Sequence, residues 1–317
     1  LVAARAILDT VAAGYQVAFM APTELLAEQH FQSLEAWLTP LALSVNWLSG
    51  RIKGKARKTI LGELAAGTVS ILVGTHALFQ DEVVFRRLGL IVVDEQHRFG
   101  VHQRLHLAAK GVDGGHPHQL ALTATPIPRS LAMVTYGDLD CSVIDELPPG
   151  RTPITTTLID TDRREAVIRR VGAACGNGRQ AYWVCTAIEE SDSLDLEAAE
   201  ATRDYLDEAL PEVRIGMVHG RMKAPEKAEM MANFKSGFIQ LLVATTVIEV
   251  GVDVPNASLM IIDNAERLGL AQLHQLRGRV GRGVVESHCL LLYRQPVSET
   301  ARERLQVMQQ THDGFVI

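Results

Sequence analysis

Apolar runs of strand length alternate with longer stretches of helical periodicity along nearly the whole chain. The strand-length runs are apolar on both faces, which is typical of parallel strands covered by helices on both sides. In the first half they predict strands over Gln16–Met20, Ser70–Val73, Leu88–Val93 and Gln119–Thr123. The periodic stretches between them predict helices over Thr23–Leu38, Lys55–Ala66, Val101–Ala109 and Arg129–Tyr136.

A proline-rich segment then interrupts this alternation. Pro148, Pro149 and Pro153 fall close together, and proline continues neither a helix nor a central strand. The pattern then restarts, with strands predicted over Ile154–Ile159, Ala181–Cys185, Ile215–Val218, Gln240–Ala244, Leu259–Ile262 and Cys289–Leu292. Helices are predicted over Arg163–Ala174, Ser193–Leu210, Pro225–Phe234 and Ala271–Leu276. Such alternation predicts an α/β fold with two tandem lobes, each a mainly parallel sheet covered by helices.

The length of 317 residues is sufficient for two domains of ordinary size. We place lobe 1 at residues 1–147, a linker at 148–153, lobe 2 at 154–295 and the start of a C-terminal extension at 296–317. The chain opens without a methionine, inside a periodic stretch, and its last residues carry no terminating signal. We therefore expect an internal fragment of a longer protein.

The composition is that of a soluble globular protein, with 47% hydrophobic and 21% charged residues and a formal charge of −6. No long apolar run or signal peptide is present, so we expect no membrane association and a cytoplasmic location. Four scattered cysteines without a C-x-x-C pair are typical of reduced thiols. Nucleic-acid-binding domains are usually basic, so any such contact has to come from local patches. The basic run at residues 51–58 is one candidate, and a solvated turn is the alternative.

Two acidic residues follow one of the predicted buried strands. Asp94 and Glu95 come directly after Leu88–Val93, and ligands of open α/β sheets bind outside the carboxyl ends of the strands. A carboxylate there can reach a magnesium ion, and its neighbour can orient or deprotonate a water. Gln96 and His97 could relay contact to the other lobe. The alternative is a loop that carries two solvated acids and an ordinary histidine.

An arginine- and glycine-rich segment lies near the other end of the chain. Residues 272–282 read Q-L-H-Q-L-R-G-R-V-G-R and include Arg277, Arg279 and Arg282. Guanidinium groups are suited to a phosphate whose charge rises during transfer. The glycines allow the backbone to approach closely at the same place. Together with the acidic pair, this segment predicts a nucleotide-driven motor.

Further candidates for chemistry follow other predicted strands: Thr123, Thr125, Thr245, Thr246, Gly251 and Asp253. The first two threonines could bridge the acidic site to a neighbouring groove, and the other two could hydrogen-bond a nucleic-acid phosphate. Gly251 and Asp253 could meet a nucleotide from the opposite side. The alternatives are ordinary strand-to-helix loops with threonine caps and a tight turn at Gly251.

Two patterns carry less weight. His102 and His106 have the spacing of a metal-binding pair on a helix, but no H-E-x-x-H glutamate accompanies them. ATP-driven motors of this architecture need a phosphate loop, G-x-x-x-x-G-K-[ST], and the chain contains none. Residues 50–56 imitate one, but the glycine spacing is one short and Ala56 lacks the hydroxyl.

The segments above, in this order, resemble the motor core of superfamily 2 helicases, specifically the bacterial RecG family. The resemblance runs along nearly all 317 residues. Its segments, similar to helicase motifs Ia to VI in order, are Ala21–His30, Gly74–Leu78, Asp94–Val101, Thr123–Arg129, Val184–Asp192, Val218–Met222, Thr245–Asp253 and Gln275–Arg282. Single motifs of this kind are weak indicators, but eight in the right order are strong.

The resemblance implies two RecA-like lobes of the P-loop NTPase type, without the phosphate loop itself, and ATP in the cleft between them. It places Asp94 at a magnesium ion and Glu95 at the attacking water, in a catalytic segment with Gln96 and His97. It makes Arg279 and Arg282 arginine fingers. Gly251, Asp253 and Gln275 would line the nucleotide, and Thr123 and Thr125 would couple it to DNA. The residues implied to touch the DNA backbone are Thr23, Gly74, Thr75, Thr245 and Thr246.

The function implied by the resemblance is that of an ATP-dependent DNA helicase or translocase. It would remodel branched DNA, such as stalled forks and Holliday junctions, in recombination and repair. We expect a monomeric motor in the bacterial cytoplasm, associated with the nucleoid. The family's wedge and hook segments are also missing. Because the phosphate loop is missing, we expect no measurable ATP hydrolysis by the fragment alone.

Other classes of protein remain as alternatives. A transcription-repair coupling factor motor shares the lobe pattern, but its family usually reads D-E-E-Q-R-F where this chain reads D-E-Q-H-R-F at residues 94–99. DEAD-box RNA helicases usually carry S-A-T in place of Thr123-Ala124-Thr125. A non-catalytic nucleic-acid-binding module would have lost the acids or the arginines. A P-loop kinase would need one lobe and a phosphate loop.

Overall fold

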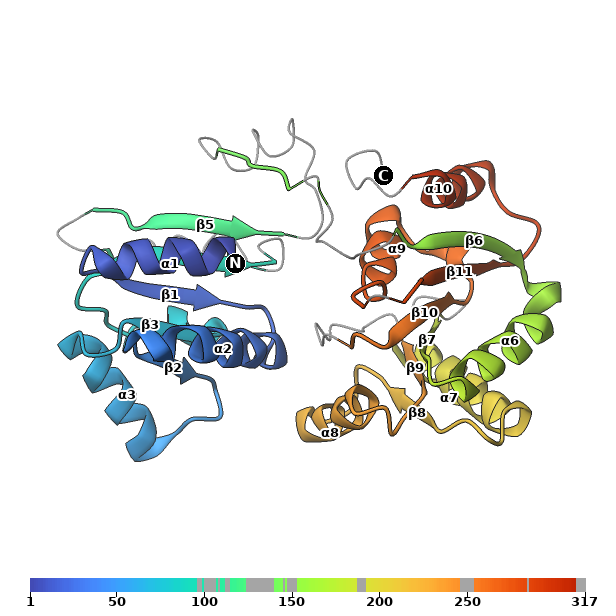
Figure 1. The fold of residues 1–317 in the computed structure, drawn as a ribbon, viewed down its shortest axis with the longest axis horizontal. Helices are drawn as coiled ribbons and strands as arrows, with labels where there is room; N and C mark the ends of the chain where they lie inside the picture. The colour runs from blue at the N-terminus through green and yellow to red at the C-terminus, as the bar shows by residue number, and fades with distance from the viewer. Residues whose placement is uncertain are drawn as a thin grey trace. The chain divides into compact units, whose positions relative to one another are not determined.

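The chain forms two compact units, residues 1–124 and 125–317. The computed structural model describes residues 1–95, 99, 107, 109–111, 115–123, 140–144, 146, 153–186, 192–245, 254–283 and 285–311. Each unit contains one parallel sheet flanked by helices (Figure 1). The expected α/β class with parallel sheets covered by helices is therefore confirmed.

The first unit is built on a five-stranded sheet with the order β2-β3-β1-β4-β5, in which every pair is parallel. Its strands are β1 (Gln16–Met20), β2 (Val45–Leu48), β3 (Ile71–Gly74), β4 (Leu88–Asp94) and β5 (His118–Leu122). Its helices are α1 (Val2–Ala12), α2 (Glu24–Leu38) and α3 (Gly54–Ala66). Because β1 lies in the middle of this sheet, both of its faces are buried.

The two faces of the first sheet have separate cores, as the alternation of side chains along a strand requires. Phe19 of β1 belongs to a cluster with Ile7 of α1 and Leu34 of α2. The adjacent residue Met20 belongs to the opposite cluster, with Leu64 of α3. The continuous apolar runs of the sequence therefore reflect burial on both faces.

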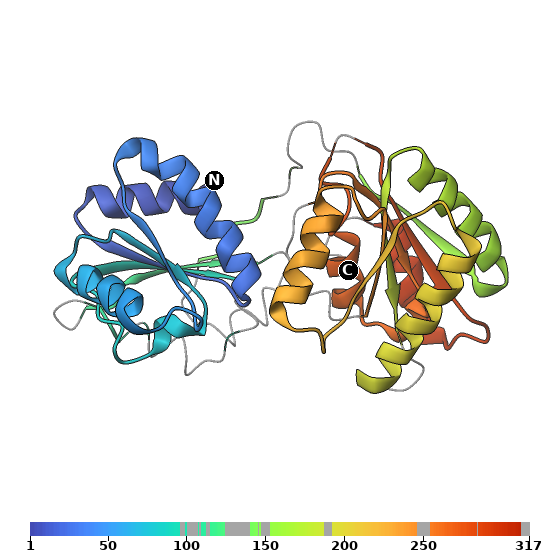
Figure 2. The ribbon, with the colours of Figure 1, turned by 90° about the horizontal axis from the view of Figure 1, so that it is seen from below.

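The second unit is built on a six-stranded parallel sheet with the order β6-β11-β10-β7-β9-β8. Its strands are β6 (Thr155–Asp160), β7 (Gln180–Cys185), β8 (Ile215–Val218), β9 (Leu241–Thr245), β10 (Ala257–Ile262) and β11 (His288–Tyr293). Its helices are α6 (Arg164–Gly176), α7 (Asp192–Ala209), α8 (Ala224–Lys235), α9 (Leu270–Arg277) and α10 (Glu299–Gln310). In Figure 2, α6 and α7 flank one face of this sheet and α8 the other.

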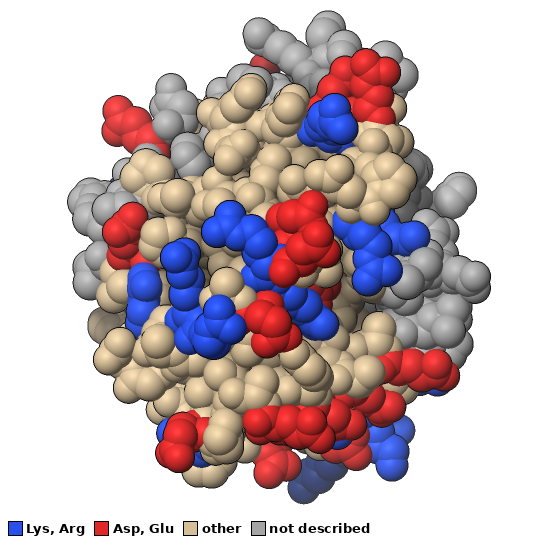
Figure 3. Space-filling view, turned by 90° about the vertical axis from the view of Figure 1, so that its right-hand side faces the viewer, with Lys and Arg blue, Asp and Glu red and all other residues tan. Residues whose placement is uncertain are grey.

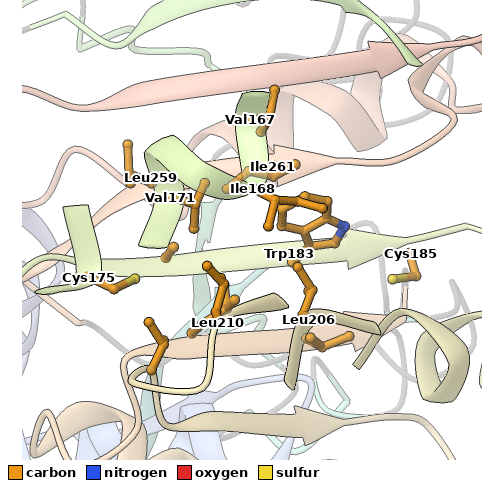
Figure 4. Close-up of a cluster of buried hydrophobic side chains, with 14 of the residues drawn as sticks. Val167, Ile168, Val171, Cys175, Trp183, Cys185, Leu206, Leu210, Leu259 and Ile261 are labelled. Carbon is orange, nitrogen blue, oxygen red and sulfur yellow. The ribbon is translucent and has the colours of Figure 1, made fainter. Parts of the chain in front are cut away.

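Trp183 of β7 is the centre of the core on the α6 and α7 side. Its fully buried indole packs with Ile168 of α6 and Leu206 of α7 (Figure 4). On the opposite face, Tyr182 meets Phe234 of α8, with ring centroids 4.8 Å apart. The second unit is thus a three-layer arrangement like the first.

The surface of the second unit over α6 and α7 carries both charges rather than a basic patch. Figure 3 shows Lys and Arg side chains beside a run of Asp and Glu. Arg169 and Arg170 of α6 are exposed, and so are the acids Asp204 and Asp207 of α7. No helix in the described part of the chain is long and apolar enough to cross a membrane.

Most predicted elements are confirmed to within two residues, and one strand was missed. The edge strand β2 was not predicted, because only its two end residues, Val45 and Leu48, are buried. The predicted helix over Arg129–Tyr136 lies outside the described residues, as does nearly all of the one over Val101–Ala109. The same holds for most of the predicted linker at 148–153.

Candidate functional site

The acidic pair lies at the carboxyl end of β4, where the sequence placed it. Asp94 is the last residue of the strand and pairs in register with Leu122 of β5. Glu95 has a φ of +50°, which is uncommon for a residue with a side chain. This turn lets the Glu95 amide donate to Asp94 Oδ1 at 3.0 Å. The Asp94 side chain is 18% exposed, so its carboxylate remains within reach of a ligand.

His30 is a member of this site that the sequence analysis missed. Its Nε2 lies 2.7 Å from Asp94 Oδ2 and its ring packs 4.6 Å, centroid to centroid, from Phe19. The two residues are 64 positions apart, so periodicity gave no indication of the contact. The only available signal was the position of His30 on the helix that begins after Thr23, which starts at the same edge of the sheet.

The carboxylate at this edge of the sheet fits a magnesium ion that is bound together with a nucleotide. Such an ion takes one or two carboxylates from the protein and keeps phosphate oxygens and waters as its other ligands. Asp94 offers an accessible carboxylate of this kind. Among the described residues, no group of three or more His, Cys, Asp or Glu side chains forms a dedicated metal cage.

The predicted DNA contacts of the first unit gather at the same carboxyl edge. Thr23 follows β1 and caps α2, accepting a hydrogen bond from the Leu26 amide at 3.3 Å. Gly74 ends β3, and a Cβ there would lie 2.4 Å from the Leu48 carbonyl oxygen. Thr75 is 1% exposed. Gly74 therefore has a packing role, and Thr75 is buried at the end of the same strand.

The basic run at residues 51–58 is partly neutralised by acids of the same unit. Arg51 pairs with Glu24 at 2.7 Å, and Arg57 pairs with Glu82. Lysines of the run are exposed. The two arginines are therefore used in ion pairs inside the unit, and the run does not form a uniformly basic patch.

The three arginines of the glycine-rich segment have different environments in the second unit. Arg277 is 2% exposed, and its Nη1 donates to the carbonyls of Met308 and Thr311, both at 2.9 Å. It therefore anchors the end of α10 and is not available to a phosphate. Arg279 is half-buried and Arg282 is exposed. The phosphate interpretation is thus wrong for Arg277 and stays a prediction for the other two.

Glycines fix the turn that carries Arg282. Gly281 has a φ of +77°, and a Cβ there would lie 2.8 Å from Ile154. A Cβ on Gly283 would lie 2.4 Å from the Pro255 carbonyl oxygen. Ile154 and Pro255 precede β6 and β10, so this turn lies at the amino ends of those strands.

Thr245 lies at the opposite edge of the second sheet. It is the last residue of β9 and is buried. Pro255, which precedes β10, lies at the amino edge, near the turn of Arg282. Gln275 is half-buried on α9, which precedes that turn.

Asp263 directly follows β10, as Glu95 follows β4, and was also missed. Its Oδ2 accepts from Arg164 Nη2 at 2.9 Å and from Trp183 Nε1 at 2.7 Å. Its backbone oxygen accepts from Thr186 at 2.8 Å, and Asn264 donates to the Thr186 carbonyl at 2.9 Å. Burial raises the pKa of the Asp263 carboxyl, although Arg164 and Trp183 act to lower it. The Asp263 carboxylate therefore binds α6 and β7 within the second unit, and its backbone oxygen holds the residue after β7.

Several predicted site residues lie outside the described residues: Gln96, His97, Thr125, Thr246, Gly251, Asp253, His102 and His106. Their roles stay predictions. Thr123, the residue after β5, is described and lies at the carboxyl edge with the acidic pair. The described cysteines are free thiols, of which Cys175, Cys185 and Cys289 are buried.

Two family models match the chain in tandem. The DEAD/DEAH box helicase model matches residues 1–134, and the helicase conserved C-terminal domain matches residues 163–284. Yeast Dbp5 bound to RNA and ADP BeF3 shares the fold, with a TM-score of 0.66 at 14% identity over 95% of this chain and 75% of its own. Both units are therefore RecA-like helicase lobes.

Closer relatives cover the whole chain. The ATP-dependent DNA helicase RecG of Escherichia coli (strain K12) is 64% identical over 319 aligned positions, which span 100% of this chain and 46% of the relative. RecG of Bacillus subtilis (strain 168) is 49% identical over 99% of this chain and 46% of the relative. A structure of RecG bound to a three-way DNA junction matches with a TM-score of 0.81 and 42% identity, over 99% of this chain and 40% of that one. The chain spans about half the length of these curated relatives, and across that span its sequence matches the RecG family.

Proposed function

We propose that this chain is the motor of an ATP-dependent DNA helicase or translocase that acts on branched DNA in recombination and repair. The observation that carries the proposal is the pair of half-sites. Asp94 and Glu95 end a strand of the first unit, and Arg282 lies exposed on a glycine-fixed turn of the second. The RecG relative bound to a three-way junction supports branched DNA, such as stalled forks and Holliday junctions, as the substrate.

The chemistry proposed for the first half-site is activation of water for attack on ATP. Asp94 would hold the magnesium ion of Mg²⁺–ATP, which withdraws charge from the phosphates. Glu95 orients or deprotonates the attacking water, because a carboxylate beside the reacting phosphate acts as a general base. Gln96 and His97 complete this segment in the proposal.

The second half-site stabilises the charge of the transferred phosphoryl group. Arg279 and Arg282 act as arginine fingers, since a fixed guanidinium stabilises charge that rises on the phosphate oxygens. Gln275, Gly251 and Asp253 line the same nucleotide. This requires that the two units close on one ATP molecule.

The DNA backbone is proposed to contact the carboxyl edges of both sheets. Thr23, Gly74 and Thr75 supply the contacts in the first unit in this proposal. Thr245 and Thr246 supply them in the second. Thr123 and Thr125 couple DNA and nucleotide in the proposal, which is supported by the position of Thr123 directly after β5, the strand that pairs with β4 at Asp94.

The organisation proposed for the protein keeps the divisions predicted from its sequence pattern. Lobes at residues 1–147 and 154–295 flank the linker 148–153, and residues 296–317 begin a further segment. The full protein is proposed to act as a monomer in the bacterial cytoplasm, near the nucleoid. A transcription-repair coupling translocase is the second candidate. RecG is favoured because the relatives aligned along the whole chain carry that name.

The proposal is tested by ATP hydrolysis and strand separation on a three-way DNA junction. The chain carrying the flanking segments of its relatives is expected to hydrolyse ATP faster when the junction is present, and to unwind it only with Mg²⁺ and ATP. The chain of 317 residues by itself is expected to show no turnover above background, because it has no phosphate loop. Absence of junction-stimulated hydrolysis in the longer protein would contradict the proposal.

A further inference from the structure

We infer that His30 is a positioning residue that holds the Asp94 carboxylate in the orientation needed for Mg²⁺–nucleotide and ties it to the DNA-contacting start of α2. The inference rests on the proposed function and adds a residue to it. It begins from the contact of 2.7 Å between His30 Nε2 and Asp94 Oδ2, made across 64 positions of the chain.

The two oxygens of Asp94 are held from two different elements. Oδ1 accepts from the Glu95 amide at 3.0 Å, and Oδ2 meets His30 Nε2. An ionised carboxylate has about four acceptor positions, so both oxygens keep capacity for a further ligand. The two bonds therefore restrict rotation of the carboxylate without occupying it completely.

The imidazole ring is itself held in place. It packs against Phe19, which is 2% exposed in the middle of the sheet, with ring centroids 4.6 Å apart. The His30 side chain is 29% exposed, so it lies at the edge of the site and not in the core. A ring fixed on one side by packing and directed at a carboxylate on the other is arranged to orient that carboxylate.

One helix connects this contact to the proposed DNA contact. Thr23 caps α2, and His30 lies seven residues further along the same helix, about 10 Å away at the rise of an α-helix. Ala27 and Leu34 of α2 are buried against the sheet. A displacement of the start of α2 by DNA is therefore transmitted to His30, and through it to Asp94.

The test compares three variants of a longer protein, in which this chain is extended by the segments that flank the matching region in its relatives. His30→Gln places an amide donor near the position of Nε2, whereas His30→Asn places it near Nδ1, too short to reach Asp94. Gln32→Ala, an exposed position of the same helix, is the matched control. Binding of a fluorescent ADP analogue is titrated with Mg²⁺, with and without a three-way DNA junction, and thermal unfolding checks each fold.

His30→Asn is expected to raise the half-saturating Mg²⁺ concentration about tenfold, the effect of losing one charge-assisted hydrogen bond. It should also reduce the effect of DNA on nucleotide affinity. His30→Gln should stay within about threefold of wild type, and Gln32→Ala should be unchanged. Equal behaviour of the Asn and Gln variants, whether both normal or both impaired, would overturn the inference while leaving the proposed function intact.

A measurement on the unaltered protein covers the case in which His30→Asn does not fold. With ¹⁵N-labelled histidine, addition of Mg²⁺–ADP is expected to shift the ring resonances of His30, assigned by their loss in His30→Gln. The exposed His76 in the same unit should not shift. Unchanged His30 resonances at saturating Mg²⁺–ADP would overturn the inference. A wild-type protein that binds no Mg²⁺–ADP would overturn both the inference and the proposed function.

Discussion

At the scale of single residues, two aspartates with the same sequence signature have opposite uses. Asp94 and Asp263 each end or follow a buried strand. Asp94 remains accessible at 18% side-chain exposure, whereas Asp263 is buried against Arg164 and Trp183. The difference arises from α6, which brings Arg164 over β7 and β10. A carboxylate after a strand therefore indicates a place in the fold, and its partners decide its role.

Asp263→Ala is expected to destabilise the second unit by roughly 3 kcal/mol, because the half-buried Arg164 guanidinium would lose its charged partner and the buried Trp183 Nε1 its acceptor. Asp263→Asn should cost less, since the amide oxygen still accepts from Trp183. Urea unfolding followed by Trp183 fluorescence measures both. Equal losses in the two variants would show that the hydrogen bond from Trp183 contributes little, and no loss in either would show that the ion pair with Arg164 does not stabilise the unit.

Glu95→Gln tests the role proposed for the second acid. The amide is nearly the same size but cannot take a proton, so ATP binding should persist while turnover falls by about 10²–10⁴-fold. Nucleotide affinity and steady-state hydrolysis, measured on the chain with its flanking segments, separate the two effects. Normal turnover in this variant would refute the assignment of Glu95 as the general base.

Among the helices and strands, those with a clear local pattern of apolar residues were predicted from the sequence. The strand β1 was predicted at its observed bounds, because all five of its residues are buried. The edge strand β2 was missed because its pattern of burial is mixed. Contacts between distant segments could not be predicted from periodicity, as the bond between His30 and Asp94 shows. The burial of Arg277 could not be predicted from the sequence either, because it depends on contacts with the end of α10, 31 and 34 positions away.

A substitution of Gly74, at the end of β3, distinguishes a packing role of this glycine from a DNA-binding role. Gly74→Ala is expected to cost about 1–3 kcal/mol, because the added Cβ would meet the Leu48 carbonyl oxygen at 2.4 Å. The matched control is Gly62→Ala in α3, where no atom lies within 4 Å of the new Cβ. There, alanine should stabilise by about 0.5–1 kcal/mol.

The midpoint of urea unfolding and the affinity for a three-way DNA junction measure the two roles of Gly74 independently. The packing account predicts a lower midpoint for Gly74→Ala and a higher one for Gly62→Ala. A Gly74→Ala protein of normal stability that has lost DNA affinity would show that the glycine serves DNA alone.

The proposed motor depends on cooperation between two units that are each complete folds. Each has its own parallel sheet and cores on both faces. The acids belong to one unit and the exposed Arg282 to the other. Neither half-site hydrolyses ATP alone in this account, which is why hydrolysis can be coupled to movement along DNA.

The most direct test of that cooperation is the turnover number of DNA-stimulated ATP hydrolysis in Arg282→Ala, measured beside nucleotide affinity. An arginine supplied across the nucleotide contributes about 10³-fold or more to turnover. We therefore predict a loss of that order with affinity for ATP nearly unchanged. Turnover within about tenfold of wild type would be too small a loss for an arginine finger. It would contradict the claim that the second unit completes the active site of the first.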